Sequence, residues 1–399
     1  METTTCCIAG GGPAGMMLGL LLARAGIEVV VLEKHGDFLR DFRGDTVHPS
    51  TLDVLDDLGL SERFEKLEHH KVTGIAVITD DGEIELPEVF AVKGSQHPYL
   101  AMVPQWDLLD LLAQEASRLP NFRLLMNAEA VDLAREGNRV TGVRYRTDAG
   151  EETIRAQLTV AADGRKSVLR ARAMLPIREY GSPMDVVWVR VPMVASDRSD
   201  SFMRLSAGHL MIAINRTAYW QLAYVVPKGR ASGLPAEELR RTISRLIPFM
   251  AGRVDRIEVG GNAVLSVRID RLRRWYRSGF LCIGDAAHAM SPIGGVGINL
   301  AVQDAVAVAN LLYEPLRRGQ VQDADLAAVQ RRRMLPTVLV QGFQRVAQRM
   351  VIEPALRGRP IHPPKGLPWL RRVPAVRQVM ARMAAYGPRP ERPRTELHA

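Results

Sequence analysis

The sequence predicts an α/β fold in which a Rossmann-like domain is interleaved with a mostly antiparallel β domain and followed by C-terminal helices. Three observations predict it. Residues 5–33 contain a buried strand, an apolar helix and a second buried strand. The stretches 72–103 and 184–227 are rich in short strands, whereas the chain beyond 345 is helical, arginine-rich and interrupted by proline. Because no flexible linker separates two halves, we expect the two domains to be wound through each other.

The domain boundaries follow from these patterns. A hairpin turn at Asp80-Asp81-Gly82 marks the first β insert, and a helix over 235–251 closes the second. Ser50 or Thr51 is the expected cap of a helix that follows His48. We assign the Rossmann-like domain to 1–71, 101–180 and 271–345, the β domain to 72–100 and 181–270, and a helical region with a tail to 346–399.

Composition is that of an ordinary globular protein, with 47% hydrophobic and 24% charged residues among 399. The formal charge is +9, but no nucleic-acid-binding motif is visible, so we expect no nucleic-acid partner. The apolar stretch Ile8–Leu22 is rich in glycine and too short to span a membrane. Cys6, Cys7 and Cys282 lie in apolar strands, which indicates buried thiols in a reducing cytoplasm, and no metal site is expected.

The first glycine cluster predicts a dinucleotide site. Gly10, Gly12 and Gly15 follow a strand and open a helix, with Pro13 and Ala14 between them. In that context the glycines allow a tight turn, close approach of a pyrophosphate and close helix–strand packing. The helix N-terminus then offers amides to the phosphates. Two further residues end the second strand and lie where a ribose binds, namely Glu33 and Lys34. This cluster leaves open whether the dinucleotide is FAD or NAD.

Two later motifs narrow the choice. They are "VAADGRKSVLR", residues 160–170, and "FLCIGDAAHAMSPIGGVGINLAVQDA", residues 280–305. With the first glycine cluster, they occur in the order and at the separations found in the group A FAD-dependent aromatic monooxygenases, the p-hydroxybenzoate hydroxylase-like flavoproteins. The chain resembles that family over about residues 4–345, and the resemblance implies tightly but non-covalently bound FAD.

The resemblance also implies roles for individual residues. Asp285, after Gly284, would bind the ribityl chain. Pro292, Gly295 and Gly297 would leave room for the isoalloxazine, and the amides of Ile298 and Asn299 would face its N1 and O2, where negative charge collects on reduction. The remaining residues implied in cofactor binding are Asp163 and Gly164, which in the family also serve the nicotinamide cofactor, together with Arg43 and Gln105.

The implied activity is hydroxylation of an aromatic, phenolic substrate, polycyclic or apolar phenols included, with NADH or NADPH and O2, through a flavin C4a-hydroperoxide. Three alternatives on the same scaffold stay open, namely alkene reduction, epoxidation and halogenation, and so does a flavin-binding protein without catalysis. The sequence leaves open whether the reductant is NADH or NADPH. It also leaves open whether the protein is a monomer or a homodimer. His288 is interpreted as a packed, hydrogen-bonding residue, and we assign no catalytic side chain because the cofactor supplies the chemistry.

Strands over 209–215 and 219–227 are expected to line the substrate pocket. Because side chains alternate along a strand, either Met211, Ala213 and Asn215 or the alternate residues Leu210, Ile212 and Ile214 face the flavin. We assign Met211, Ala213, Asn215, Gln221 and Pro292 to the pocket. Because no arginine–tyrosine pair suited to a benzoate is visible, a larger, less polar phenol is expected. The C-terminal region is expected to pack on the FAD domain, with a frayed tail after Gly387.

Overall fold

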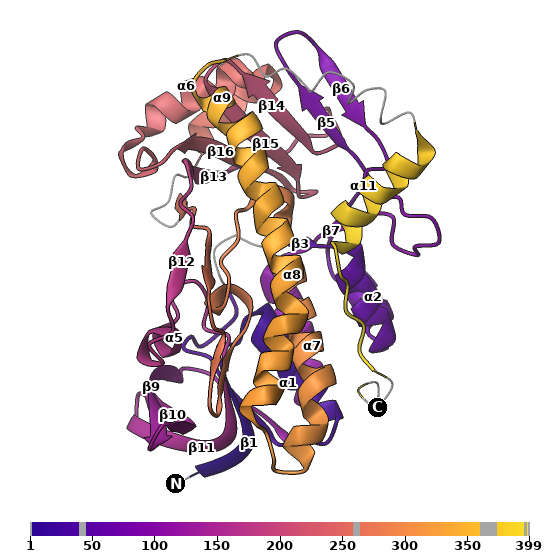
Figure 1. The fold of residues 1–399 in the computed structure, drawn as a ribbon. Helices are drawn as coiled ribbons and strands as arrows, with labels where there is room; N and C mark the ends of the chain where they lie inside the picture. The colour runs from indigo at the N-terminus through magenta and orange to yellow at the C-terminus, as the bar shows by residue number, and fades with distance from the viewer. Residues whose placement is uncertain (1, 40–44, 258–263, 360–372, 395–396, 398–399) are drawn as a thin grey trace.

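The computed structural model describes residues 2–39, 45–257, 264–359, 373–394 and 397 (Figure 1). An α/β domain lies at one end and a β-rich domain at the other, and a long helix runs along both (Figure 1). The chain passes between the domains several times. The predicted mixed α/β class is confirmed.

The larger sheet has a parallel centre. Strands β20, β11, β1, β2 and β8 pair in that order, each parallel to the next. β1 ends in four fully buried residues and β2 is buried throughout, as strands covered on both faces require. The strands of this sheet are β1 (Glu2–Ala9), β2 (Val29–Leu32), β8 (Phe122–Leu125), β9 (Glu129–Glu136), β10 (Arg139–Thr147), β11 (Gly150–Ala161), β19 (Tyr276–Arg277) and β20 (Phe280–Cys282).

Three helices cover this sheet and share its core. They are α1 (Pro13–Arg24), α4 (Gln105–Ala116) and α7 (Gly297–Arg317). α1 packs on both α4 and α7. By length and hydropathy, Ile293–Arg317 is the only helical stretch in the described part of the chain that could cross a membrane. Most of that stretch is buried against its neighbours, as the core helix of a globular domain would be.

The β domain is built on a seven-stranded sheet in the order β17-β13-β16-β15-β14-β5-β6. One face packs under α6 (Ala236–Leu246) and the 3-10 helix η2 (Pro248–Arg256). The other face contacts Ile293 of the α/β domain and residues of the C-terminal region. The strands are β5 (Ile75–Ile78), β6 (Glu83–Leu86), β13 (Met184–Pro192), β14 (Phe202–Ser206), β15 (His209–Asn215), β16 (Tyr219–Pro227) and β17 (Val264–Ser266).

Small elements connect the two domains. Strands β3 (Thr46–Val47), β7 (Leu100–Met102) and β4 (His70–Val72) form a three-stranded sheet, and β12 (Ile177–Glu179) pairs with β18 (Asp270–Leu272). The short helices are α2 (Pro49–Asp57), α3 (Ser61–Glu65), α5 (Val168–Arg172), η1 (Ala231–Gly233), η3 (Gly284–Ala286) and η4 (Ile293–Gly295).

After α7 the chain forms α8 (Asp323–Ala347), a π-helical turn, η5 (Gln348–Ile352), and then α9 (Glu353–Leu356) and α11 (Pro374–Tyr386) of the C-terminal region. α11 packs on α2, beside the loop that follows β6 (Figure 1). The prediction of a frayed tail after Gly387 is wrong for the described residues. Glu391 is buried, and Arg392 pairs with Asp53 at 2.8 Å, so the tail is held by buried and paired charges.

Candidate cofactor and substrate site

Four predicted residues meet at one edge of the larger sheet. Gly10 follows β1, Glu33 follows β2, Asp163 comes two residues after β11, and Asp285 comes three residues after β20. These four strands are parallel, so their carboxyl ends lie side by side. Ligands of open α/β sheets bind at this edge.

Glycine is favoured for a different structural reason at each position of the first cluster. Gly10 has φ +109°, and a Cβ there would lie 2.4 Å from the carbonyl oxygen of Ala162. A Cβ on Gly15 would lie 1.9 Å from the carbonyl oxygen of Gly10. A Cβ on Gly12 would meet nothing within 4 Å. Packing therefore demands glycine at positions 10 and 15, whereas Gly12 borders open space at an N-terminus of α1 that no side chain caps.

Glu33 ties the glycine loop to the second strand. Its carboxylate is buried and accepts hydrogen bonds from the Gly11 amide at 2.9 Å and the His35 amide at 3.0 Å. A carboxylate has about four acceptor positions, so it can also accept from ribose hydroxyls. Lys34 is exposed beside it.

Asp163, Arg165 and Asp285 form the polar centre of the edge. Arg165 Nε donates to Asp285 Oδ2 at 2.9 Å, and the charge of Asp285 raises the pKa of Arg165. Burial raises the pKa of Asp163, although the Leu169 amide donates to its Oδ2 at 3.2 Å. Gly164 turns the chain with φ +80°. Arg165 was not predicted, and its position two residues after Asp163 is the signal that could have indicated it.

The glycines of the second cluster form a tight loop against β3. Gly294 and Gly295 have φ +80° and +63°, which favour glycine. A Cβ on Gly295 would lie 2.8 Å from Thr46 Oγ1. The ring of His48, one residue past β3, lies 3.1 Å from the Gly294 carbonyl oxygen and 3.0 Å from that of Ala384 in α11. The loop is therefore fixed from both β3 and the C-terminal helix.

The N-terminus of α7 follows this loop at Gly297. No side chain caps it, and Ile298 and Asn299 are buried in its first turn. The Asn299 side chain accepts from the hydroxyls of Ser50 and Thr51, the latter at 3.0 Å. The prediction that Ser50 or Thr51 caps α2 is therefore wrong, because their hydroxyls bind α7 and His48 is the N-cap without a capping bond.

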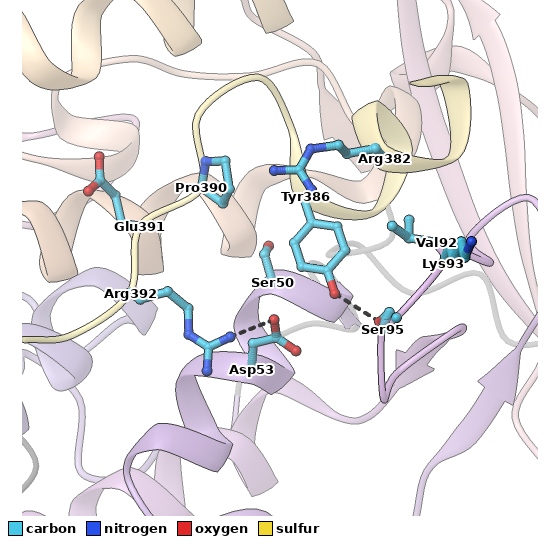
Figure 2. A pocket seen from close by; sticks show the side chains of 11 residues that line it. Ser50, Asp53, Val92, Lys93, Ser95, Arg382, Tyr386, Pro390, Glu391 and Arg392 are labelled. Atoms are coloured by element: carbon cyan, nitrogen blue, oxygen red, sulfur yellow. Dashed lines mark hydrogen bonds and ion pairs between the residues drawn. The ribbon is translucent and has the colours of Figure 1, made fainter. Parts of the chain in front are cut away.

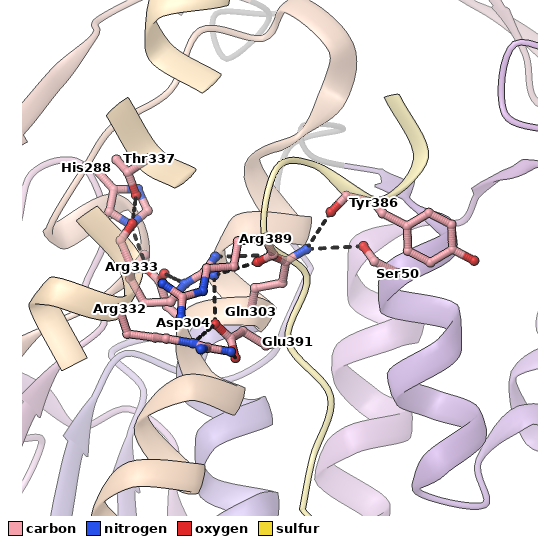
Figure 3. A network of polar contacts seen from close by, with 11 residues as sticks. Ser50, His288, Gln303, Asp304, Arg332, Arg333, Thr337, Tyr386, Arg389 and Glu391 are labelled. Carbon is pink, nitrogen blue, oxygen red and sulfur yellow. Dashed lines mark hydrogen bonds and ion pairs between the residues drawn. The ribbon is translucent and has the colours of Figure 1, made fainter. Parts of the chain in front are cut away.

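A buried polar network centred on Asp304 accepts a hydrogen bond from the Gly284–Asp285 turn, and Figure 3 shows the side chains of the network. Asp304 Oδ2 accepts from the Gly284 amide at 3.0 Å and lies 2.6 Å from His288 Nε2, while Oδ1 accepts from Arg333 at 2.9 Å. Burial acts to raise the pKa of Asp304, but His288 and Arg333 outweigh it and hold that pKa below its usual range. The interpretation of His288 as a hydrogen-bonding residue agrees with these contacts.

Arg333 connects this network to the C-terminus. It is fully buried and donates to Glu391 at 3.2 Å and to the Arg389 carbonyl at 3.1 Å (Figure 3). It also donates to Gln303, whose amide reaches Ser50. The segment after α11 is therefore joined to the same core that positions the cofactor loops.

Two remaining predicted cofactor residues have different outcomes. Arg43 lies outside the described residues. Gln105 is the first residue of α4, and its backbone amide donates to Asp45 Oδ1 at 3.3 Å. Asp45 also forms a buried ion pair with Arg216, whose Nε donates to Gln221 Oε1 at 2.8 Å. Sequence reasoning missed this pair, which joins the end of β15 to the segment before β3.

The assignment of Met211, Ala213 and Asn215 to the substrate pocket is wrong. Met211 and Ala213 are fully buried in the core beneath α6 and η2, and the Asn215 amide donates to the Ser199 carbonyl at 2.7 Å. The other set of β15 side chains therefore faces the α/β domain. Gln221 pairs with Ile214, and Ala223 with Ile212, on the face toward the α/β domain.

That face is mostly apolar. Trp188 of β13 is opposite Ala223, which is opposite Ile212, so the three form one row across the sheet. They cluster with Ile293, next to Pro292 of the glycine loop. The Trp188 Nε1 is buried and has no hydrogen-bond partner among the described residues.

A cavity of about 280 Å³ lies elsewhere, between α2, the loop after β6 and the C-terminal segment (Figure 2). Tyr386 donates to Ser95 at its rim, and Arg392 closes the opposite side on Asp53. None of the predicted substrate residues lines it. Most of its lining residues have polar or charged side chains, and it is not where the sheet edge and the glycine loop meet.

The residues present fit FAD. Asp163 Oδ1 and Arg165 Nη1 are buried at the sheet edge and have no hydrogen-bond partner among the described residues. Buried polar atoms are normally hydrogen-bonded, so these two atoms suit contact with a polar ligand. Gly12 and the two uncapped helix N-termini suit a pyrophosphate and an electron-rich ring. Gly294 and Gly295 present no side chains in the loop. The donor set therefore matches a ligand with anionic and hydroxyl-bearing parts.

This fold and site define an FAD-dependent monooxygenase. A family model described as an FAD binding domain matches residues 2–341. 6-Methylpretetramide 4-monooxygenase of Streptomyces rimosus is 31% identical over 400 residues, covering 99% of this chain and 95% of the relative. Para-nitrophenol 4-monooxygenase of a Pseudomonas strain is 25% identical over 346 residues, 82% of each chain. The chain belongs to the group A FAD-dependent aromatic monooxygenase family, as its motifs predict.

A solved structure shows the same fold. The p-nitrophenol 4-monooxygenase of Pseudomonas putida superposes with a TM-score of 0.78 at 21% identity, covering 96% of this chain and 95% of that one. The predicted p-hydroxybenzoate hydroxylase-like fold is therefore confirmed.

Proposed function

We propose that the protein uses NADH or NADPH and O2 to hydroxylate an apolar phenol. The observation that carries this proposal is the row formed by Trp188, Ala223 and Ile212, which lies beside the Pro292–Gly297 loop. The redox chemistry with the nicotinamide and with oxygen is supplied by FAD when it is bound. The chain's own residues then have to bind, orient and shield the aromatic substrate.

The charges near this face favour a neutral substrate. Arg216 is the buried cation at the end of β15, but Asp45 neutralises it and Gln221 occupies its Nε. A carboxylate would have to compete with Asp45 in a buried place, which is costly. The unpartnered Trp188 indole N–H can instead donate to a phenol or ketone oxygen. We therefore propose an alkylated or polycyclic phenol without a carboxylate near the reacting ring.

The cofactor proposals rest on the four strand ends. Asp285 and Arg165 would hold the ribityl and phosphate side, and Glu33 the adenosine ribose. The amides at the start of α7, those of Ile298 and Asn299, would stabilise negative charge on the ring by about 1–2 kcal/mol. The nicotinamide cofactor would bind transiently near Asp163.

The test is to purify the yellow protein and screen neutral and carboxylated phenols for stimulated NADH and NADPH oxidation under labelled O2. We expect a neutral phenol to stimulate oxidation and to gain one labelled oxygen atom. Anaerobic reduction of the compound, or label in water alone with every phenol, would contradict the proposal. Rapid, coupled turnover of p-hydroxybenzoate would contradict the neutral-substrate part alone.

A further inference from the structure

Three arginine side chains gather around the ring of Tyr180, and we call these four residues the Tyr180 cluster. The guanidinium carbons of Arg178, Arg271 and Arg345 lie 5.2, 5.3 and 4.8 Å from the ring centroid. Arg178 belongs to β12, Arg271 to β18 and Arg345 to α8, so three separate elements contribute. In the part of the chain that the structure describes, none of the three arginines forms an ion pair with a carboxylate.

The β12–β18 ribbon places like charges opposite each other. Arg178 is the direct cross-strand partner of Arg271, and Glu179 is that of Asp270. Because side chains alternate along a strand, the two arginines share one face of the ribbon and the two carboxylates share the other. Like charges directly opposite each other destabilise a sheet. Burial lowers the pKa of Arg271, and the charges of Arg178 and Arg345 lower it further. The fold therefore holds three cations together against their mutual repulsion.

Hydrogen bonds hold Arg271 in place within the cluster. Its Nη2 donates to the Tyr180 hydroxyl at 2.6 Å, and its Nη1 donates to Gln341 Oε1 at 2.9 Å. Gln341 is buried, and its own amide donates to two backbone carbonyl oxygens, so it is fixed as well. A guanidinium has more N–H donors than these two bonds use, so others can bind a ligand. Arg271 is thus a preorganised donor, whereas the exposed Arg178 can close over a bound group.

An open, basic groove of about 680 Å³ lies between the same two segments, the residues after β18 and α8. Arg273 and Arg274 line it on one side, and Arg331 lines it on α8. Arg274 pairs with Asp323 at 3.5 Å. Val338 also lines the groove and precedes Gln341 on α8 by about one helical turn. A ligand held by the Tyr180 cluster therefore meets further positive charge along the groove.

We propose that the Tyr180 cluster is a binding site for a phosphate dianion. Arginine forks match the geometry of phosphate oxygens, and such charge-assisted hydrogen bonds are strong. A dianion also offsets more of the repulsion among three cations than a carboxylate does. Two sources carry this group, namely the free phosphate ion and the 2′-phosphate of NADPH. The second source rests on the proposed function and would make NADPH the preferred reductant.

The experiment measures binding without turnover, by isothermal titration calorimetry of the flavin-loaded full chain with inorganic phosphate and with 2′,5′-ADP. Sodium chloride keeps the ionic strength constant, because salt screens exposed charges. We expect saturable binding, and we expect Arg271→Met and Arg178→Met each to raise the dissociation constant about 10-fold. Arg241→Met is the matched control, since Arg241 is exposed on α6 and lies outside the cluster. Unchanged flavin absorbance shows that the variants fold.

The two sources give different results. If the site holds the 2′-phosphate, 2′,5′-ADP should bind more tightly than phosphate, and Arg271→Met should raise KM for NADPH about 10-fold more than KM for NADH. If the site holds the free ion, phosphate should bind at least as tightly as 2′,5′-ADP, and the two KM values should change together. A wild-type protein that binds neither probe, or variants that bind both as tightly as wild type, overturns the proposal, whether or not a phenol is hydroxylated.

Melting temperature separates binding from a structural role. Phosphate should raise the melting temperature of wild type and leave that of Arg271→Met unchanged, because a ligand stabilises only a protein that binds it. In chloride alone, Arg178→Met should melt no lower than wild type, since the substitution removes a repulsion. A lower melting temperature of Arg178→Met in chloride, with no response of wild type to phosphate, would show that the arginines only support the fold and would overturn the proposal.

Discussion

Arg165 and Asp285 form an ion pair across the carboxyl edge of the sheet, with 2.9 Å between Nε and Oδ2. They come from loops after two neighbouring parallel strands, β11 and β20. The pair aligns a carboxylate and a guanidinium at the place where the ribityl and phosphate groups would bind. It therefore joins the two later motifs, and it would couple them within one cofactor site.

Replacing either partner should weaken FAD binding. Hydrogen bonds to charged groups contribute about 1.5–3 kcal/mol, so Asp285→Asn and Arg165→Met should each raise the FAD dissociation constant about 10–100-fold. Fluorescence titration of the apoprotein measures it, with exposed Lys166→Met as the control. If the double variant loses the full sum of both effects, the two residues act independently and the coupling is refuted.

The glycines at positions 12 and 15 should differ in what they support. Gly12→Val should leave the apoprotein's melting temperature nearly unchanged and abolish FAD binding, because its Cβ faces open space. Gly15→Ala should destabilise the apoprotein by about 1–3 kcal/mol, since its Cβ would overlap the Gly10 carbonyl. Thermal unfolding without FAD separates the two, and equal melting temperatures would contradict the packing argument.

Removing Arg333 should destabilise the fold strongly. Arg333→Leu removes the fully buried guanidinium that Asp304 and Glu391 share and leaves them only His288 and Arg332, which should cost about 3–5 kcal/mol in urea unfolding. Arg332→Leu is the control, because Arg332 is more than one-third exposed and its bond to Glu391 is worth about 1 kcal/mol or less. Similar losses in both variants would show that the buried network is not what holds the C-terminal segment.

His48 should make stability depend on pH. Burial lowers the pKa of His48 below its usual 6.5. The unfolded chain therefore binds the proton more readily than the folded chain, so this contribution to stability is present above pH 6.5 and is lost as pH falls below it. The melting temperature of wild type should drop between pH 7 and 5.5 by more than that of His48→Gln. An identical drop in the two proteins would assign the effect to other groups.

The two faces of β15 should respond differently to truncation. Met211→Ala removes a fully buried side chain and should cost about 2–5 kcal/mol of stability with little change in KM. Ile212→Ala, on the face toward Ile293, should raise KM for the best phenol with a smaller loss of stability. Steady-state kinetics with parallel urea unfolding checks this. A KM change confined to Met211→Ala would restore the original assignment.

Local pattern was enough to predict the secondary structure around the three motifs. Gly10, Gly12 and Gly15 follow a buried strand and open a helix, and such a pattern has one structural solution at short range. Asp163 and Asp285 follow further apolar runs, and parallel pairing brings the ends of such strands to one edge. The sequence therefore predicted the class of fold, FAD as the cofactor and the family.

What the sequence by itself determined is local: strand and helix periods, turn residues and the three motifs. Only the tertiary structure decided which face of β15 lies toward the Pro292–Gly297 loop, because an alternation of period two is satisfied equally by either face. It also decided the Arg165–Asp285, Arg216–Asp45 and Arg333–Glu391 pairs. Their partners lie far apart along the chain, so no local pattern links them, and only packing brings the opposite charges into contact.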